Sequence, residues 1–221
     1  MKVVLFGATG MVGQGVLREC LLDPAVESVL AIGRNATAER HQKLQEIVHS
    51  DLADLTPIED RLAAYDACFF CLGVSSAGMT EQAYRRLTYD LTLSVARVLV
   101  RLNPTMTFIY VSGAGTDSTE RGRLMWARVK GATENSLLGM FKSAYMFRPA
   151  YIQPLHGIRT KTVLYRAFYA ILAPLYPLWK LLLPKYVTTT ECVGRAMILV
   201  ALRGAPKRVL ESQDIAAACR P

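Results

Sequence analysis

The sequence has no long uncharged apolar run. In its C-terminal part the longest such run covers residues 167–179, which is 13 residues with two prolines inside it, whereas a membrane-spanning helix needs about 20 apolar residues. At the start, Lys2 is followed by four apolar residues and then by Gly7, which is too short for the apolar core of a secretion signal. We therefore expect neither a conventional transmembrane helix in that part nor a secretion signal.

Cysteine is scarce and follows no framework spacing. An odd number of cysteines without a regular pattern indicates reduced thiols in a cytoplasmic protein; the five are Cys20, Cys68, Cys71, Cys192 and Cys219. Cys68 and Cys71 match the C-x-x-C pattern, but residues 66–73 read as a buried strand, in which side chains three apart point to opposite faces. We therefore predict no metal site and no redox role for this pair.

Acidic residues are few in the last third of the chain. Residues 151–221 hold 10 Lys and Arg but only 3 Asp and Glu, a net charge of +7, whereas residues 1–150 hold 16 and 15, a net charge of +1. A basic lobe can attract a phosphorylated ligand, nucleic acid or an anionic membrane surface. Because no basic run exceeds two residues, a solvated face explains the charge equally well, and no nucleic-acid-binding module is recognisable.

What the chain does have is the composition of a folded domain. Hydrophobic residues make up 52% and charged residues 20% of its 221 residues, which excludes a disordered or fibrous chain and suffices for one core. Short apolar runs alternate with helix-like patterns. The expected strands are 2–6, 26–32, 44–48, 66–72, 106–111 and 144–147, and the expected helices are 11–22, 80–102 and 121–138.

This order of elements predicts an α/β fold, a doubly wound parallel sheet (Rossmann) with helices on both faces. After residue 149 the pattern changes, and we expect an amphipathic helix at 188–203 and a last short strand at 208–210. We read residues 1–221 as a single domain whose last third covers the open end of the sheet, with residues 150–188 as a small C-terminal lid on the substrate side.

The first expected strand ends in glycines at Gly7, Gly10 and Gly13. Gly7 permits a tight turn, Gly10 lets the backbone approach a pyrophosphate, and Gly13 lets the helix pack closely on the sheet. The N–H groups that open the helix, with its dipole, favour the phosphates. The segment therefore predicts a dinucleotide cradle, to which Thr9, Met11 and Val12 also contribute.

The end of the second strand indicates which dinucleotide is bound. An NAD site calls for an acid about 20 residues after the glycines, but residues 31–35 offer no acid and one guanidinium, that of Arg34. Arg34 can pair with a 2′-phosphate, so we favour NADP over NAD. The alternative is an arginine that lies free on the surface.

Two further strand ends are compatible with a bound dinucleotide. Asp51 and Leu52 follow the third strand, where an acid can meet the adenine amino group, although Asp51 can also cap a helical turn. Cys71, Leu72 and Gly73 end the fourth strand, where a glycine lets the backbone lie along the cofactor.

Together these segments resemble the atypical branch of the short-chain dehydrogenase/reductase superfamily, nearest to its Tat-interacting-protein-like and NAD-dependent epimerase-dehydratase-like members. Residues 110–112, 130–131 and 147–149 continue the likeness, which is good to about residue 155 and loose beyond. The resemblance implies a Rossmann fold that binds NADP(H) or NAD(H), with Lys130 on the nicotinamide ribose and with Pro149 and Ile152 beside the cofactor.

The catalytic set that the resemblance implies is a serine, a tyrosine and a lysine, with the tyrosine four residues before the lysine on one helical face. Here Lys130 matches the lysine, but Trp126 stands in the place of the tyrosine, and an indole N–H cannot exchange a proton at useful pH. Ser112 matches the serine region, but Gly113 follows it where many relatives have a second serine. The cofactor site is thus intact and the proton-transfer site is altered.

Several explanations of this alteration stay open. The protein can be an enzyme that uses another acid, namely Tyr151, Tyr89 or a water held by Ser112, or it can be a non-catalytic NADP(H)-binding regulator or scaffold. Trp126 can also be a core residue on a helix shifted in register. Lys130 has an alternative role as a solvated partner of Glu134.

The segment after residue 155 contains one histidine and two apolar stretches that bear on the substrate and the partners. His156 either touches substrate or is structural. Residues 164–172 and 175–183 are too apolar to lie exposed. They either pack on the domain or on a second copy in a homodimer. Alternatively, residues 164–185 form an apolar pocket or a peripheral membrane contact. We expect an oxidoreductase or epimerase-like protein for a small carbonyl or hydroxyl substrate, without a metal.

Overall fold

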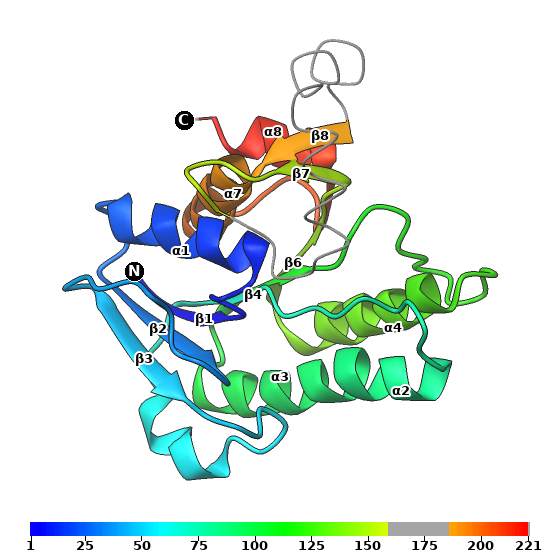
Figure 1. Cartoon of the computed structure of the whole chain (residues 1–221), viewed down its shortest axis with the longest axis horizontal. Coiled ribbons are helices and arrows are strands. Elements are labelled where there is room, and N and C mark those ends of the chain that lie inside the picture. The colour runs from blue at the N-terminus through cyan, green and yellow to red at the C-terminus, as the bar shows by residue number, and fades with distance from the viewer. Residues whose placement is uncertain (159–185, 221) are drawn as a thin grey trace.

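The computed structural model describes residues 1–158 and 186–220. At its centre lies a seven-stranded sheet in the order β3-β2-β1-β4-β5-β6-β9, in which every neighbouring pair is parallel (Figure 1). The strands of this sheet are β1 (Lys2–Phe6), β2 (Ser28–Gly33), β3 (Leu44–Val48), β4 (Ala67–Phe70), β5 (Thr107–Val111), β6 (Ser143–Arg148) and β9 (Val209–Glu211). The predicted doubly wound α/β fold is confirmed.

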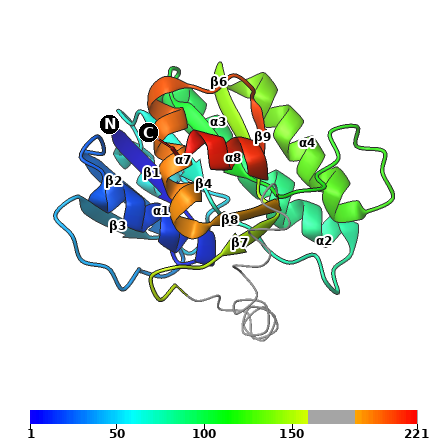
Figure 2. The same ribbon diagram turned by 90° about the horizontal axis from the view of Figure 1, so that it is seen from above.

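Helices cover both faces of the sheet, as Figures 1 and 2 show. One face carries α1 (Met11–Leu22), α7 (Thr190–Arg203) and α8 (Ser212–Ala218), and the other carries α2 (Glu81–Arg85), α3 (Leu91–Leu102) and α4 (Met125–Met140). Each face has its own apolar core, because the strands between them are buried on both sides. A 3₁₀ helix, Thr56–Arg61, packs into the core of the second face through Ile58.

The strand order reverses between β1 and β4, since β2 and β3 lie on one side of β1 whereas β4, β5 and β6 lie on the other. In β1, Val3 to Phe6 are fully buried, which explains the uninterrupted apolar run. In an open parallel sheet the carboxyl ends of the strands form a crevice at the reversal point. The loops after β1 and β4 therefore meet there.

Three of the expected helices differ from the structure at their ends or in the middle. The helix expected at 80–102 begins as predicted, because the Thr80 side chain accepts the Ala83 N–H, but it contains a π-helical segment, Arg86–Asp90. The helix expected from residue 121 begins at Met125, because Asp117 accepts the Gly122 N–H at 2.6 Å and holds the preceding residues in a turn.

The helix expected at 188–203 begins two residues later, at Thr190. Residues Val187–Thr189 form β8, which pairs with β7 (Tyr151–Gln153) in a small second sheet, and α7 follows with Thr189 as its cap. Neither β7 nor α8 was expected, because each is too short to show a periodic pattern.

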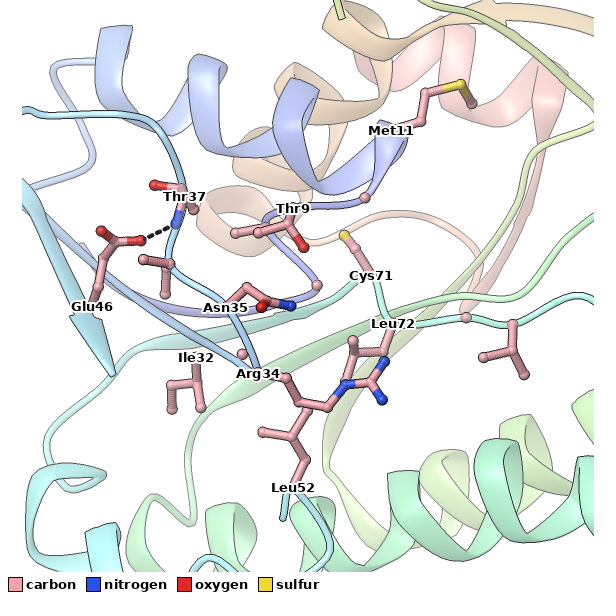
Figure 3. A pocket seen from close by; sticks show the side chains of 18 of the residues that line it. Thr9, Met11, Ile32, Arg34, Asn35, Thr37, Glu46, Leu52, Cys71 and Leu72 are labelled. Atoms are coloured by element: carbon pink, nitrogen blue, oxygen red, sulfur yellow. Dashed lines mark hydrogen bonds between the residues drawn. The ribbon is translucent and has the colours of Figure 1, made fainter. Parts of the chain in front are cut away.

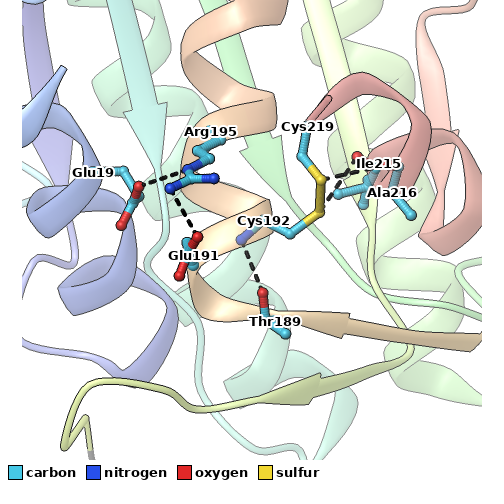
Figure 4. Close-up of a disulfide and its surroundings, with 8 residues drawn as sticks. All are labelled: Glu19, Thr189, Glu191, Cys192, Arg195, Ile215, Ala216 and Cys219. Carbon is cyan, nitrogen blue, oxygen red and sulfur yellow. Dashed lines mark hydrogen bonds and ion pairs between the residues drawn. A yellow bond between two sulfur atoms is a disulfide. The ribbon is translucent and has the colours of Figure 1, made fainter. Parts of the chain in front are cut away.

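The described part of the C-terminal third, residues 186–220, adds to one edge and one face of the sheet, and the expected covering of the open end stays a prediction. Strand β9 lies beside β6, and α7 packs against α1. The two helices approach closely, since a Cβ on Gly194 would lie 2.7 Å from Glu19 Cγ. Arg195 then bridges Glu19 at 3.1 Å and Glu191 at 2.8 Å (Figure 4).

Most of the expected lid, residues 150–188, lies outside the described residues, as does the whole of the apolar segment 164–185. The lid, the homodimer and the peripheral membrane contact therefore stay predictions. In the described ranges, no helix combines the length and apolarity that crossing a membrane requires.

A disulfide joins Cys192 of α7 to Cys219 at the end of α8, with a Cα–Cα distance of 5.2 Å (Figure 4). The expectation that all cysteines are reduced is wrong for this pair, because the fold places two residues 27 positions apart side by side. Cys20, Cys68 and Cys71 are free. Cys68 packs in the core of the α3 face and Cys71 against that of the α1 face, so the C-x-x-C pair points to opposite sides as predicted.

Removing the disulfide should lower stability without changing the fold. A crosslink that closes a loop of this length stabilises a domain by ~3 kcal/mol, chiefly by restricting the unfolded chain. We expect Cys219→Ser to lower the free energy of unfolding in urea by that amount when measured without reductant. With dithiothreitol present, the variant and the wild type should unfold together; equal stability without reductant would show that the crosslink is not formed.

Candidate functional site

A cavity of about 550 Å³ opens at the carboxyl ends of the strands, where their order reverses (Figure 3). Its walls come from the loops after β1, β2, β3 and β4 and from one side chain of α4. Ten of the expected site residues line it: Gly7, Thr9, Gly10, Met11, Arg34, Leu52, Cys71, Leu72, Gly73 and Lys130. The topology thus brings together segments that lie up to 123 positions apart in the chain.

The glycine turn forms the floor of the cavity. Gly7 has a φ of +85°, and a Cβ there would lie 2.7 Å from the Cys71 carbonyl carbon, so only glycine fits between the loops after β1 and β4. A Cβ on Gly13 would lie 2.0 Å from Gly7 O. Gly13 is therefore the packing contact that seats α1 on the turn rather than a residue of the cavity wall.

The first turn of α1 presents backbone donors to this floor. Gly10 is the N-cap residue and has no side chain to cap the helix, and the first backbone bond of the helix runs from Gln14 N to Gly10 O at 2.8 Å. The N–H groups of Met11, Val12 and Gly13 precede it and have no partner within the helix. Such an uncapped N-terminus at the floor of a cavity fits a diphosphate.

The loop after β2 forms the end of the cavity near the sheet edge. Arg34 is exposed and forms no hydrogen bond or ion pair within the described residues, and its side chain extends into the cavity (Figure 3). The loop is anchored by Glu46 of β3, whose Oε1 accepts the Thr37 N–H at 2.7 Å. Sequence reasoning missed Glu46, because the contact joins a strand to a loop nine residues earlier.

Of the two residues expected after β3, one lies in the cavity. Leu52 is buried and lines it, whereas Asp51 does not and its Oδ1 accepts the Ala53 N–H at 2.9 Å. Asp51 therefore caps a turn, which was the alternative role considered for it, and its contact with adenine stays a prediction. After β4, Cys71, Leu72 and Gly73 all line the cavity as expected.

Lys130 reaches the cavity from α4. Its Nζ donates a hydrogen bond to the backbone oxygen of Ser112, at the end of β5. Burial lowers the pKa of Lys130 to about 8, and the Glu134 carboxylate opposes this shift. The expected side-chain pair of Lys130 with Glu134 is not formed, because Glu134 is bonded to other groups.

Glu134 is fully buried and forms an ion pair with Arg148 of β6. Its Oε1 also accepts the Ser112 hydroxyl, which lies 3.1 Å from Phe147 O as well. Arg148 extends the network to Ser118 and to Glu211. The spacing of these residues in the chain gives no sign that they meet, so sequence reasoning missed the network.

The network includes Ser112, which was expected in the catalytic set. Ser112 is buried, does not line the cavity, and donates its hydroxyl proton to Glu134 rather than to a ligand. Its backbone oxygen, which Lys130 binds, faces the site instead. In this arrangement the Ser112 hydroxyl is bound within the buried network, and its expected role at a substrate oxygen stays a prediction.

Trp126 and the two tyrosines considered as alternative acids also lie away from the cavity. Trp126 does not line it, and its ring is the nearest neighbour of Gly115, 3.4 Å from where a Cβ would be. The Tyr89 hydroxyl lies 3.1 Å from Ser136 Oγ, and the Tyr151 hydroxyl donates to Gln153 Oε1 at 2.7 Å. None of the three side chains reaches the site.

The remaining expected residues fall outside the cavity wall. Val12 and Gly13 are in the first turn of α1 but do not line it, and neither do Pro149 and Ile152. Ile152 is part of the core of the α1 face, and Pro149 O accepts the Ala114 N–H at 2.9 Å. Their expected contact with a cofactor stays a prediction.

His156 lies in a second cavity of about 690 Å³ beside α1. Its Nε2 is 2.8 Å from Glu191 Oε2, so it has a structural partner there. Among the described residues, no group of three or more His, Cys, Asp or Glu side chains is placed to bind a metal ion.

Comparison with known proteins identifies the family. A model of the NAD dependent epimerase/dehydratase family matches residues 3–119, more than half of the chain. The chain belongs to this family. The match ends within the loop after β5, so it covers the cradle and the strand ends but not α4.

Individual relatives agree with this assignment. The protein fmp52, mitochondrial, of Emericella nidulans is 30% identical in an alignment of 165 positions that covers 68% of this chain and 66% of that protein. The protein FMP52, mitochondrial, of Chaetomium globosum is 23% identical over 67% of this chain and 65% of that protein. The matched part of the chain thus spans just under two thirds of the length of these relatives.

Solved structures show the same fold. An ADP-L-glycero-D-manno-heptose-6-epimerase of Helicobacter pylori has a TM-score of 0.67 at 14% identity, over 98% of this chain and 80% of its own. The enzyme WbmF of Bordetella bronchiseptica, solved with NAD+, has a TM-score of 0.65 at 16% identity, over 98% and 76%. The resemblance to the atypical short-chain dehydrogenase/reductases and the Rossmann fold are confirmed.

The names of the relatives correct one expectation. Further relatives from Aspergillus and Scheffersomyces species, at 24–26% identity, also carry the name fmp52 or FMP52-2 and the word mitochondrial. The expectation of a cytoplasmic protein is wrong on this finding. It was based on the cysteine count and the first residues, and the disulfide removes the first of these supports.

Replacing Glu46 should weaken dinucleotide binding through the loop after β2. Glu46→Ala removes the acceptor of the Thr37 N–H, and one such bond to a charged group contributes about 1.5–3 kcal/mol. We expect NADPH affinity, measured by calorimetry, to fall about tenfold, whereas Glu46→Gln should retain most of it because the amide oxygen also accepts. Gln45→Ala, an exposed change on the same strand, is the control.

Breaking the buried ion pair should destabilise the fold. Glu134→Ala leaves Arg148 buried without its main partner, which costs about 3–5 kcal/mol. Urea unfolding should show this loss, and the double variant Glu134→Ala/Arg148→Met should regain most of it because no buried charge remains unpaired. If the single variant is as stable as the wild type, the network does not carry the stability assigned to it.

Proposed function

We propose that the chain binds NADP(H) in the 550 Å³ cavity and acts as an oxidoreductase or epimerase-like enzyme on a small carbonyl or hydroxyl compound. The observation that carries the proposal is the cradle of Gly7, Gly10 and Gly13 under the uncapped N-terminus of α1. Membership of an NAD-dependent family supports it.

The choice of NADP over NAD rests on the charge at the end of β2. Arg34 extends into the cavity without a partner within the described residues, and no acid stands at that strand end to accept a ribose hydroxyl. The acid nearby, Glu46, is occupied by the Thr37 N–H. A planar guanidinium without a partner is suited to a 2′-phosphate, which it binds through two parallel hydrogen bonds.

Different residues along the cavity would bind different parts of the dinucleotide. The N–H groups of α1 and the dipole of the helix bind the diphosphate, and Lys130 at the other end binds the nicotinamide ribose. The bound nicotinamide supplies or takes up a hydride. Gly73 lets the backbone lie along the cofactor, because nothing lies within 4 Å of a Cβ added there.

A second candidate function is a non-catalytic NADP(H)-binding regulator or scaffold. It is favoured by the altered proton-transfer site, in which Trp126 replaces a tyrosine and packs at Gly115, and Ser112 donates its proton to a buried carboxylate. In this alternative the cavity binds the dinucleotide and no substrate is turned over.

Cofactor choice is tested by calorimetry with NADPH and NADH. We expect Arg34→Ala to weaken NADPH binding by about 10- to 100-fold, as for the loss of a charged hydrogen-bonded pair, and NADH binding by less than about threefold. Arg40→Ala, an exposed arginine outside the cavity, is the matched control. Equal losses for both nucleotides would reject the NADP assignment, and no binding of either would reject the proposed function.

Catalysis is tested by incubating the protein with NADPH and a panel of aldehydes and ketones, beside Trp126→Tyr. Turnover by the wild type supports the enzyme. Tight NADPH binding without turnover by the wild type supports the non-catalytic protein, and activity gained in Trp126→Tyr would show that a phenol at this position of α4 does reach the substrate.

A further inference from the structure

The proposed reaction needs a group that exchanges a proton, and the cavity limits the choice. Four titratable side chains of the described residues line it, namely Arg34, Glu46, Cys71 and Lys130. A guanidinium does not lose its proton in proteins, and burial raises the pKa of the Cys71 thiol to about 12. Glu46 lies on the edge strand β3 and is held by Thr37.

Lys130 differs from these three in its position and its bonding. It comes from α4, which follows β5, so it stands at the end of the cavity opposite β3. Its Nζ gives one hydrogen bond to Ser112 O, and an ammonium has three donors. Two N–H groups are therefore left for a ligand.

The backbone at Gly113 passes close to the amine. A Cβ on Gly113 would lie 3.8 Å from Nζ, an ordinary contact distance, so glycine places no side chain beside the group. The indole of Trp126, four residues earlier on α4, packs at Gly115 instead of over the amine.

We propose that the Lys130 amine is itself the proton donor and acceptor of the reaction, in place of the absent tyrosine. The inference rests on the proposed function, since it requires a nicotinamide and a carbonyl compound in the cavity. It differs from the ribose-binding role of Lys130, because it demands that the group lose and regain a proton in each cycle.

The ionisation of Lys130 suits this role. Burial lowers its pKa to about 8, so both protonation states are available near neutral pH, whereas an exposed lysine stays charged. The charged neighbour that opposes the shift is Glu134 on the same helix. Glu134 is bound to Arg148 of β6 and to Ser112 of β5, and the Cys71 thiol after β4 also lines the cavity.

In carbonyl reduction, a bound reduced nicotinamide would supply a hydride to the carbonyl carbon, and the π electrons of the carbonyl would move to its oxygen. One N–H bond of the Lys130 ammonium breaks, its proton bonds to that oxygen, and the electron pair stays on Nζ. The products are the alcohol, the oxidised nicotinamide and a neutral amine, which takes a proton from solvent.

The first test measures the amine directly and needs no turnover. Acetylation of each lysine by acetic anhydride is followed by mass spectrometry from about pH 6 to about pH 11, a range that brackets the ordinary pKa of lysine. We expect the midpoint for Lys130 near pH 8 and bound NADPH to protect Lys130, with free Nα-acetyl-lysine as the reference amine. A Lys130 midpoint equal to that of the reference amine would overturn the proposal.

The second test separates binding from proton transfer. Lys130→Arg keeps a positive charge but cannot release a proton, so we expect NADPH affinity to stay within about threefold and kcat for the aldehydes and ketones to fall about 100-fold or more. Lys142→Met is the control. For the wild type, kcat for reduction should fall as the pH rises through about 8, because the ammonium is lost.

The outcomes distinguish this inference from the proposed function. Suppose that the wild type reduces members of the panel. If the kcat of Lys130→Arg then stays within about tenfold of the wild-type kcat, or if the pH profile of kcat has no inflection, Lys130 is not the acid, although the protein is an enzyme as proposed. If the wild type binds NADPH but reduces no member of the panel, both the proposed enzymatic activity and the role of Lys130 as proton donor are rejected.

Discussion

The close approach of three backbone segments at Gly7, Gly13 and Cys71 is the constraint on which the site depends. A Cβ on Gly7 would collide with the loop after β4, and one on Gly13 would collide with Gly7 O. Because both side chains are absent, α1 begins directly on the turn after β1, and its first N–H groups meet the reversal point of the sheet. The cavity, its Arg34 loop and Lys130 are arranged around that point.

A second constraint comes from the buried pair of Glu134 and Arg148. A carboxylate and a guanidinium without water are stable only when they face each other and their remaining groups are bonded. Glu134 satisfies this requirement by accepting the Ser112 hydroxyl, and Arg148 does so through Ser118 and Glu211. The same bonds that stabilise the interior therefore take Ser112 out of the cavity and leave its backbone oxygen to Lys130.

The C-terminal elements complete the layer on α1. Glycines at the helix contact, the Glu19–Arg195–Glu191 ion pairs and the Cys192–Cys219 disulfide all tie α7 to its neighbours. Glu211 precedes α8 and also contacts Arg148. The disulfide-linked part of the fold is thus connected by side-chain contacts to the network under the cavity.

The sequence by itself determined the α/β fold, the bounds of β1, α1 and β3, and ten residues of the cavity wall, because each depends on local signals: apolar runs, helical spacing and glycines at a strand end. Only the tertiary structure decided the bonding of Ser112, the turn at Asp51, the anchoring of the loop by Glu46 and the disulfide. These depend on which distant residues come into contact and on which buried charges must be paired, and no pattern within one segment records that.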